Sequence, residues 1–342
     1  MFPRILVLGF PLLAAYGLWS GGLAVWLFPL VTFGLVPLAE LVVRPDRVNL
    51  ADESEARAER MFDVLVALCV PLIWMLVALF LLRFERYTPA EVVGAVFTLG
   101  IALGTFGINV GHELGHRRGL LMQNLAKAAL MSSLYVHFFI EHNRGHHAKV
   151  ATPEDPVYSP RGTSMYRHWL RAVPGTWMES WRLEEERLAR KGRSPWTWEN
   201  EHIRLQLAQL GVIGFFVALA GPLATLGWIA AAVVGFLLLE SVNYIEHYGL
   251  ERRRLTTGKY ERVLPIHSWN SDHPIGRVLL FELTRHSDHH ANPGRPYQVL
   301  RSFPEAPQFP TGYPGMVLLA TVPPLFYRVM HPRLAKWENR VA

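Results

Sequence analysis

The sequence predicts an all-α integral membrane protein of six transmembrane helices with a histidine-rich cap on the cytoplasmic side. Of its 342 residues, 51% are hydrophobic and only 18% are charged, which is too apolar a balance for an ordinary soluble enzyme. The apolar residues form long runs, and a helix needs about 20 such residues to cross the hydrocarbon core. Most of the fifteen histidines lie in short clusters outside these runs or at their ends.

The six predicted spans are separated by turn residues or by charged segments. We place them at about 5–20, 22–43, 62–82, 90–110, 206–223 and 225–245. The Ser20-Gly21-Gly22 and Gly221-Pro222 breaks make the first and last pairs helical hairpins. The apolar stretch continues past residue 40 without a small-residue cleavage site, so we expect no cleaved signal peptide. The chain is therefore one membrane domain, 1–342, whose cap consists of 111–205 and 246–342.

The distribution of positive charge predicts how the chain is oriented. Arginine and lysine are abundant between the second and third spans and between the fourth and fifth, whereas the turn at 83–89 is short. By the positive-inside rule, the charged segments, both termini and the histidine clusters lie in the cytoplasm. Contacts of basic loops with membrane lipid then explain the net charge of +6, and no nucleic-acid partner is expected.

Cysteine is too scarce to build a redox centre. The single cysteine, Cys69, lies inside a predicted span. A disulfide framework, a thiolate cluster and an intrinsic iron–sulfur centre are therefore excluded. Any electrons that the chain uses must come from another protein.

The histidine clusters predict two bound metal ions. They are HELGH (His112, His116), HNRGHH (His142, His146, His147), NYIEHYG (His247) and HSDHH (His286, His289, His290). Residues four apart share a helix face, so His112 and His116 can converge on one ion, and so can His142 and His146. His147 points about 100° away from His146 and could reach a second ion. Such imidazole-rich ligation suits iron, zinc or copper and not magnesium or calcium.

Two other interpretations account for less of the sequence. HELGH alone is typical of zinc proteases, with Glu113 as the general base. A zinc protease needs only one ion, however, and leaves HNRGHH and HSDHH without a role. A non-catalytic sterol- or lipid-sensing protein would be expected to lose ligands, and here every cluster is complete.

With ATPEDP after the second cluster, HSWNSDH before the last and NPGRPYQ after it, the motifs resemble those of the integral-membrane non-haem di-iron alkane 1-monooxygenases. These belong to the membrane fatty-acid desaturase/hydroxylase superfamily. The resemblance runs from about 111 to 333. It implies a di-iron cap in a bacterial inner membrane, dioxygen as co-substrate, and terminal hydroxylation of medium- or long-chain n-alkanes taken from the bilayer. It also implies rubredoxin, with an NAD(P)H-dependent rubredoxin reductase, as electron donor. The implied metal ligands are His112, His116, His142, His146, His147, His247, His286, His289 and His290.

Two related activities remain as alternatives. An aromatic or terpene methyl-group monooxygenase, acting on xylene or cymene, would share the same histidine clusters. A fatty-acid desaturase or hydroxylase is less favoured, because desaturases usually have HxxHH where this chain has HxxxHH. The PEDP and NPGRPYQ segments favour the alkane branch.

Acidic residues within or next to the clusters are candidates to receive the second N–H of the ligand imidazoles. They are Glu113, Glu141, Glu246 and Asp288, and less clearly Asp155 and Glu282. The alternative for each is an ordinary salt bridge in the cap. Among the remaining histidines, we expect His168, His202 and His331 to lie on the surface.

Overall fold

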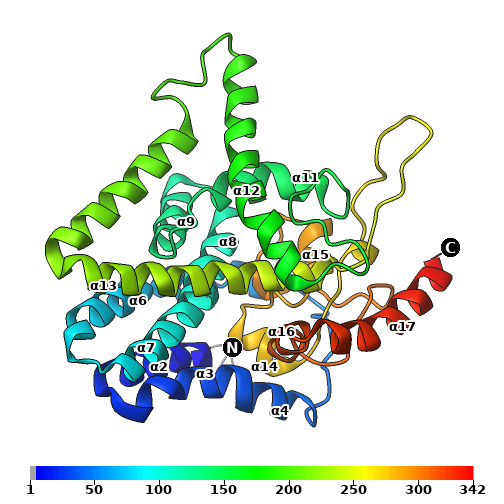
Figure 1. Ribbon diagram of the computed structural model, residues 1–342. Helices are drawn as coiled ribbons and strands as arrows, with labels where there is room; N and C mark the ends of the chain where they lie inside the picture. Colours follow the sequence, from blue (N-terminus) through cyan, green and yellow to red (C-terminus); the bar gives the residue numbers. More distant parts are fainter. Residues whose placement is uncertain (1–4, 342) are drawn as a thin grey trace. The chain divides into compact units, whose positions relative to one another are not determined.

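The computed structural model describes residues 5–341, and the predicted all-α class is confirmed for them (Figure 1). Within this range the only β pairing is two isolated bridges, Arg254 to Tyr260 and Asn270 to Gln308. The chain divides into two compact units. The first unit comprises 1–31, 58–145 and 176–239, and the second comprises 32–57, 146–175 and 240–342.

Long apolar helices dominate the first unit. Its N-terminal part contains η1 (Leu6–Leu8), α2 (Gly9–Ser20), η2 (Gly22–Trp26) and α3 (Leu27–Leu30). The middle part contains α6 (Met61–Arg83), η4 (Phe84–Arg86), α7 (Pro89–Ala102), α8 (Asn109–Gly115), α9 (Leu120–Ser132) and α10 (Phe138–Glu141). The π-helical turn η5 (Leu103–Ile108) joins α7 to α8, so one continuous helix leads to the HELGH cluster.

Among the described residues 5–341, four helices are long and apolar enough to cross a membrane, judged by length and composition. They are Gly22–Glu40, Met61–Arg86, Pro89–Gly115 and Glu201–His247, and Leu6–Ser20 is a shorter apolar helix. The predicted second, third and fourth spans coincide with the first three of these. The predicted fifth and sixth spans both lie within Glu201–His247. The count of six spans therefore stays a prediction, whereas a membrane protein with several apolar helices is confirmed.

The helix α13 (Glu201–His247) is broken at the glycine that the sequence indicates. Gly221 has φ 82° and ψ 165°, a backbone conformation that favours glycine, and Pro222 follows it. The break leaves two arms, 201–220 and 222–247, and the sharp bend between them is visible in Figure 1. Each arm is close to the length that a membrane crossing needs.

Glycines allow close helix packing around the HELGH helix. A Cβ atom added to Gly100 would lie only 2.5 Å from the Cβ of Val234 in α13. One added to Gly111 would lie 2.7 Å from the Cγ of Leu130 in α9. Small residues of this kind let helix backbones approach closely in membrane proteins. The position of His112 therefore depends on the glycine next to it.

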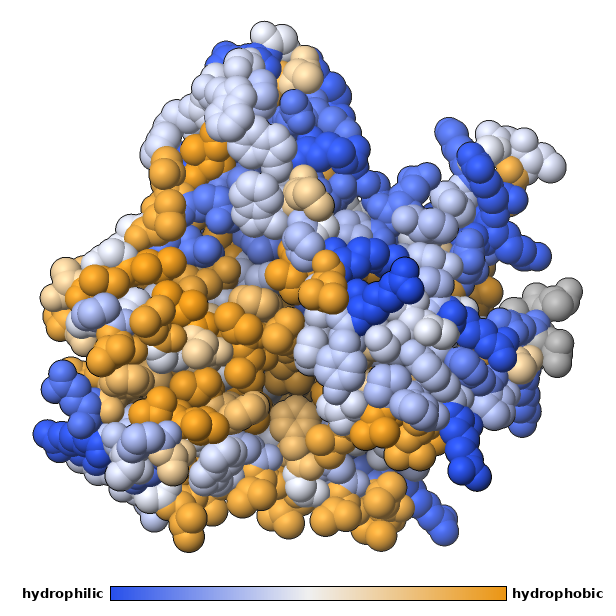
Figure 2. Space-filling model, viewed as in Figure 1, coloured by the Kyte–Doolittle hydropathy of each residue, from blue (hydrophilic) through white to orange (hydrophobic). Residues whose placement is uncertain are grey.

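Large apolar side chains cover the outside of these helices. Figure 2 shows hydrophobic surface over the long helices of the first unit. The exposed residues there include Leu12, Leu23, Leu82, Leu210, Leu219 and Leu223. A soluble protein rarely exposes so extensive an apolar surface, which indicates contact with lipid.

The second unit combines short helices with long irregular segments. Its first helices are η3 (Val31–Leu35), α4 (Val36–Glu40), α5 (Ser54–Ala58), α11 (His147–Lys149) and the beginning of α12 (Met165–Ala189). After the end of α13 come η7 (Pro265–His267), α14 (Pro274–Leu279), α15 (His286–Ala291), η8 (Tyr297–Val299), α16 (Tyr313–Ala320) and α17 (Pro323–Val341). Trp269, Tyr248 and Phe326 are fully buried among them.

Candidate metal centre

Four histidines of the second unit converge on one buried point. They are His146, His247, His286 and His290, and one ring nitrogen of each lies within 4.8 Å of those of the others. The Nε2 atoms of His146 and His290 are 3.2 Å apart, and those of His247 and His286 are 3.3 Å apart. None of the four is more than 3% exposed. We call this set the four-histidine site.

The donor chemistry of the four-histidine site fits an iron ion. Burial, with other imidazoles close by, lowers the pKa of His290 well below its usual value, so its ring is neutral. Neutral imidazole is the form that binds transition metals. Four nitrogen donors so close together suit iron, zinc or copper. A bound cation would also satisfy ring nitrogens that face one another across a buried space.

Two carboxylates contact this site from different sides. Asp155 Oδ2 lies 2.8 Å from Nδ1 of His146, the nitrogen that does not face His290. It therefore accepts the second N–H and fixes the ring. Glu246 Oε2 lies 3.2 Å from Nε2 of His286, which is the nitrogen that faces His247. Glu246 therefore lies on the side of the ring where the nitrogens converge, and not behind it.

A second group of histidines lies in the first unit. His112 and His116 come from the end of the HELGH helix, and His142 begins the π-helical turn η6 (His142–His146). The Nε2 atoms of His116 and His142 are 3.2 Å apart, and the ring centres of His112 and His142 are 4.4 Å apart. Phe138 stacks on His142 at 4.6 Å. We call this set the three-histidine site.

The two remaining predicted ligands form a pair in the second unit. The Nε2 atoms of His147 and His289 are 3.1 Å apart. His147 begins α11, and His289 lies in the middle of α15. All nine predicted ligands therefore have another predicted ligand as a close neighbour within their own unit.

The sequence-based grouping of the HNRGHH histidines was wrong. His142 and His146 were expected to share an ion because they are four residues apart. In the structure, however, His142 joins the three-histidine site and His146 joins the four-histidine site. The reason is local: His142–His146 is a π-helical turn, with hydrogen bonds between residues five apart, so the α-helical face rule does not hold. Such turns are frequent at functional sites.

The HSWNSDH segment holds the four-histidine site in place, a role that the sequence-based prediction missed. Asn270 Oδ1 accepts a hydrogen bond from the backbone N–H of Ser287, 2.8 Å away, in α15, which carries three of the predicted ligands. The backbone N–H of Trp269 donates to the carbonyl of Glu246 at 2.8 Å, next to His247. Polar residues concentrated in a segment without regular structure were the available signal.

Arg285 anchors the start of α15 in the same way. Its guanidinium donates to a carboxylate oxygen of Asp272 at 3.3 Å and to the carbonyls of Leu300 and Val48 at 2.7 and 3.1 Å. It is nearly fully buried. A buried arginine with this many partners fixes the backbone directly before His286.

Three of the other acidic candidates, Asp288, Glu113 and Glu282, make salt bridges with arginine. Asp288 lies between ligand histidines in the sequence, yet both of its oxygens contact Arg301, and Arg295 Nε lies 3.1 Å away. Glu113 pairs with Arg117 at 2.8 Å. Glu282 pairs with Arg277 at 2.6 Å. The fourth candidate, Glu141, is buried.

Two histidines expected on the surface are buried, so that prediction was wrong. His168 Nδ1 lies 2.8 Å from Ser159 Oγ, and its Nε2 lies 3.4 Å from Glu240. His202 Nδ1 lies 2.9 Å from Ser180 Oγ. A polar ring can be buried where it finds hydrogen-bond partners, and sequence alone does not reveal such partners.

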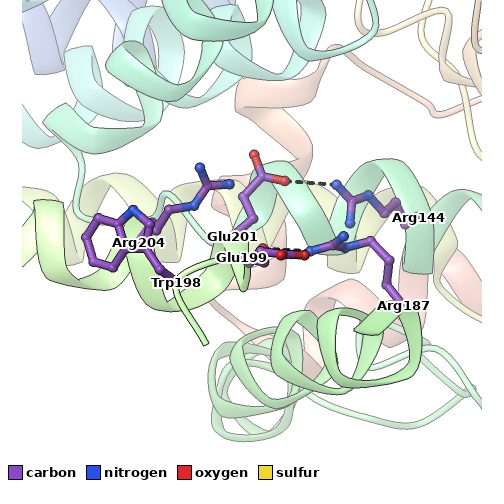
Figure 3. A pocket seen from close by; sticks show the side chains of 6 residues that line it. All are labelled: Arg144, Arg187, Trp198, Glu199, Glu201 and Arg204. Carbon is purple, nitrogen blue, oxygen red and sulfur yellow. Dashed lines mark hydrogen bonds and ion pairs between the residues drawn. The ribbon is translucent and has the colours of Figure 1, made fainter. Parts of the chain in front are cut away.

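The arginine inside HNRGHH connects the ligand segment to a network of acids in the first unit. Arg144 contacts Glu184 at 2.6 Å and Glu201 at 2.9 Å. Figure 3 shows Arg144 and Arg187 pointing toward the acids that line a pocket of about 410 Å³. Burial would raise the pKa of Glu184, but hydrogen bonds from Arg187, the N–H of Glu201 and Arg144 outweigh it and lower the pKa to about 2.

The sequence of the chain matches a protein-family model. Residues 88–320, more than half of the chain, match the model described as fatty acid desaturase. The chain belongs to the fatty acid desaturase family. The match includes all of the predicted ligand histidines and the HSWNSDH segment between them, and it ends before α17.

Within the fatty acid desaturase family, the chain is similar to curated alkane 1-monooxygenases. It is 40% identical to the Alkane 1-monooxygenase of Pseudomonas putida over 93% of this chain and 78% of that protein. It is 42% identical to Alkane 1-monooxygenase 2 of Pseudomonas aeruginosa over 96% and 90% of the two chains. Identity to the xylene/toluene monooxygenase hydroxylase component of Pseudomonas putida is 31% over 95% and 87%. The resemblance inferred from the motifs is thereby confirmed.

Proposed function

We propose that the protein is an alkane 1-monooxygenase that hydroxylates the terminal carbon of medium- or long-chain n-alkanes to primary alcohols. The convergence of four buried imidazoles, with Asp155 fixing one of them, carries the proposal. Similarity to alkane 1-monooxygenases over more than nine-tenths of the chain supports the substrate class. An unactivated C–H bond offers no polar handle for acid–base chemistry, so a metal and dioxygen are needed.

Two iron ions are proposed as the cofactor. The four-histidine site would hold one ion and the three-histidine site would hold the other. His147 and His289, which pair within the second unit, are proposed as the remaining ligands. When bound, iron supplies the redox chemistry that reduces dioxygen with two electrons and two protons, placing one oxygen atom in the alcohol and the other in water.

The residues of this chain prepare the site for that chemistry. Burial of the four imidazoles keeps bulk water out, which protects an oxidising centre from side reactions. Asp155 holds the His146 ring in one orientation and one tautomer. Glu246, on the side where ring nitrogens converge, is placed to hold a proton near the reacting atoms.

The membrane explains how an alkane would reach the enzyme. Alkanes dissolve in the bilayer, and exposed leucines cover the long helices. Substrate can therefore enter sideways from the lipid, and a narrow path that admits the chain end first makes the terminal methyl the reachable carbon. We place the protein in a bacterial inner membrane, with six spans and with the histidine cap and both termini in the cytoplasm.

Electrons would come from a separate protein. Cys69 is buried, and a lone buried thiol cannot form a redox centre. Rubredoxin, with its NAD(P)H-dependent reductase, is the proposed donor.

A second candidate activity is hydroxylation of an aromatic or terpene methyl group. The similarity to the xylene/toluene monooxygenase component, over 95% of this chain, favours it as the alternative. Both activities would use the same metal centre and differ in the shape of the substrate path.

Product analysis distinguishes the two candidates. Cells that express the chain with a rubredoxin and its reductase are fed mixed n-alkanes, p-xylene and p-cymene, and products are identified by gas chromatography–mass spectrometry. We expect primary alkanols that are absent when the His286→Ala protein replaces the parent. Benzylic alcohols alone would establish the second activity. An iron-loaded protein with an active donor that forms neither product would refute both.

A further inference from the structure

An alkane monooxygenase consumes two electrons in each turnover, and a separate protein must deliver them. The inference of a docking surface for that protein rests on the proposed function. Within residues 5–341, the only cysteine is Cys69, which is buried. The carrier protein must therefore approach the histidines closely enough to pass electrons to them. A docking surface should combine exposed charge, a hollow that excludes water and a short connection to a ligand histidine.

The hairpin 251–262 of the second unit carries exposed positive charge. Its two arms are joined by the bridge between Arg254 and Tyr260 and by a 2.8 Å hydrogen bond from the N–H of Leu255 to the carbonyl of Lys259. Figure 1 shows it as a yellow arm that extends from the unit. The exposed charged side chains are Arg253, Arg254, Lys259 and Arg262, against Glu251. The exposed charge of the hairpin is therefore clearly positive.

Arg252 connects this hairpin to the HNRGHH ligand segment. Unlike its neighbours, Arg252 is buried. Its NH1 group donates to the carbonyl of Ala148 at 2.9 Å, and its Nε donates to the carbonyl of Glu261 at 2.7 Å. Ala148 directly follows His146 and His147 in the sequence. One guanidinium therefore joins both arms of the hairpin to the backbone next to two predicted ligands.

A groove at the base of the hairpin includes a residue whose backbone contacts that of a third predicted ligand. It has a volume of about 240 Å³, and its lining includes Gly249, Leu250, Ile266, Leu334 and Trp337. The N–H of Leu250 contacts the carbonyl of His247 at 3.3 Å. The groove also includes Arg253 and Glu261 from the hairpin. The groove therefore combines apolar and charged lining residues, and protein–protein interfaces usually combine both kinds.

We propose that the hairpin 251–262 and this groove are the docking surface for an acidic one-electron carrier protein. The positive hairpin would steer an acidic partner, and the groove would bring its redox centre to the backbone beside His247. Complementary charge of this kind mainly raises association rate and specificity. Arg252 acts as a positioning residue that keeps the docked surface in register with the ligand segment.

The arginine-rich pocket of Figure 3 fits a carrier less well. In the pocket of Figure 3, Arg144 is paired with Glu184 and Glu201. Arg187 is likewise bonded to Glu184. The side chains of Arg144 and Arg187 are only 38% and 27% exposed, whereas that of Arg253, which pairs with Glu261 at 3.4 Å, is 77% exposed. Paired charges that are largely covered attract a partner weakly. The exposed turn that follows α12 carries two basic residues, Arg190 and Lys191. It serves as a control surface for charge reversal, because it is positively charged and lies outside the hairpin.

Charge reversal tests the docking surface. The Arg253→Glu/Arg254→Glu/Lys259→Glu variant is compared with parent and with Arg190→Glu/Lys191→Glu, all iron-loaded in lipid nanodiscs. The rate of alcohol formation is measured against the concentration of reduced acidic rubredoxin. We expect the hairpin variant to raise the KM for rubredoxin about tenfold or more at low ionic strength, with a smaller difference at high salt. The control variant should keep the parent KM.

A neutral variant and a second reductant separate docking from the chemistry at the metal centre. Arg253→Gln/Arg254→Gln/Lys259→Gln should give an intermediate KM, because it removes attraction without adding repulsion. A single turnover with dithionite, which needs no docking, should give the parent yield in every variant. Parent protein that forms no alcohol with dithionite would contradict the proposed function. Normal dithionite turnover combined with an unchanged KM for rubredoxin in the charge-reversed hairpin would overturn the docking proposal alone.

Discussion

The four-histidine site of the second unit and the three-histidine site of the first unit are built in different ways. The four-histidine site is assembled from a helix end, a π-helical turn and the short helix α15, which are held by irregular segments. Its four histidines are almost completely buried. The three-histidine site joins the end of one long apolar helix, which carries His112 and His116, to His142 at the start of η6, and its His116 is only half-buried. Hydrogen bonds position the first site, whereas helix packing positions the second.

This difference predicts that the two sites respond differently to the substitution of one residue and to removal of the metal. Hydrogen-bonded networks in a buried site are cooperative, so the loss of one member leaves other polar groups unsatisfied. At the three-histidine site, a half-buried histidine at a helix end leaves room for water to enter and for a bound metal ion to exchange. We therefore expect a single substitution in the four-histidine site to abolish its function. We expect the three-histidine site to release a bound metal ion more readily.

The largest effect should follow the loss of a buried ligand. In His286→Ala, we expect turnover to fall to background and bound iron to fall, while membrane insertion is retained. His286 faces both His247 and Glu246, and alanine would replace a ligand with an empty buried space. Activity assays, iron analysis and membrane fractionation test this.

His331→Ala is the matched control for that change. His331 is a partly exposed histidine of the same unit that contacts Tyr248 and no predicted ligand. It should keep iron and activity. An active His286→Ala protein with normal iron content would overturn the ligand assignment.

The next largest effect should come from the carboxylate behind His146. Asp155→Asn should weaken iron binding about 10–100-fold, because the amide holds the His146 ring less well in its ligand orientation. Iron titrations in competition with a chelator measure this.

Asp288→Asn provides the contrast, since Asp288 contacts arginines. It should lower the free energy of unfolding by about 1–3 kcal/mol and change iron affinity much less. Equal losses of iron affinity in the two variants would contradict the distinct roles that their contacts indicate.

Metal removal should separate the two sites in time. Treatment with a chelator should remove iron in two phases, with the three-histidine site emptied first because His116 is half-buried. We expect the rates to differ about tenfold, which corresponds to about 1.4 kcal/mol in the barrier to release. Stopped-flow absorbance follows the release. His116→Ala should eliminate the fast phase, and a variant that instead eliminates the slow phase would reverse the assignment.

The smallest effect concerns acid stability in the first unit. Burial, followed by the nearby His202, lowers the pKa of His137 to about 3, so the folded protein does not bind a proton there near neutral pH. The unfolded chain does so below about pH 6.5. Stability contributed by neutral His137 is therefore full above that pH and declines as pH falls toward 3. Between about pH 7 and 5.5 the loss should be about 1 kcal/mol.

Thermal melts of His137→Gln measure that contribution. The variant should lose less stability than the parent over the same pH range, by about 2–4 °C in Tm. Parallel pH profiles for the two proteins would show that His137 is not the group responsible.

Several features of the fold and the site could be predicted from sequence because their causes are local. Apolar runs indicate membrane helices, and the Gly221-Pro222 pair indicates the break in α13. The histidine clusters indicate metal binding because few other functions need so many imidazoles. The grouping of ligands could not be predicted, because it depends on the π-helical turn at His142–His146.

The sequence by itself therefore determined the class of protein and supplied the histidines that are the candidate metal ligands. Only the tertiary structure decided which histidines meet, that Asp155 contacts His146 while Asp288 contacts arginines, and that HSWNSDH holds α15. The physical reason is the range of the interactions. Hydrophobicity and helix geometry act between near neighbours in the chain, whereas these contacts join residues that only folding brings together.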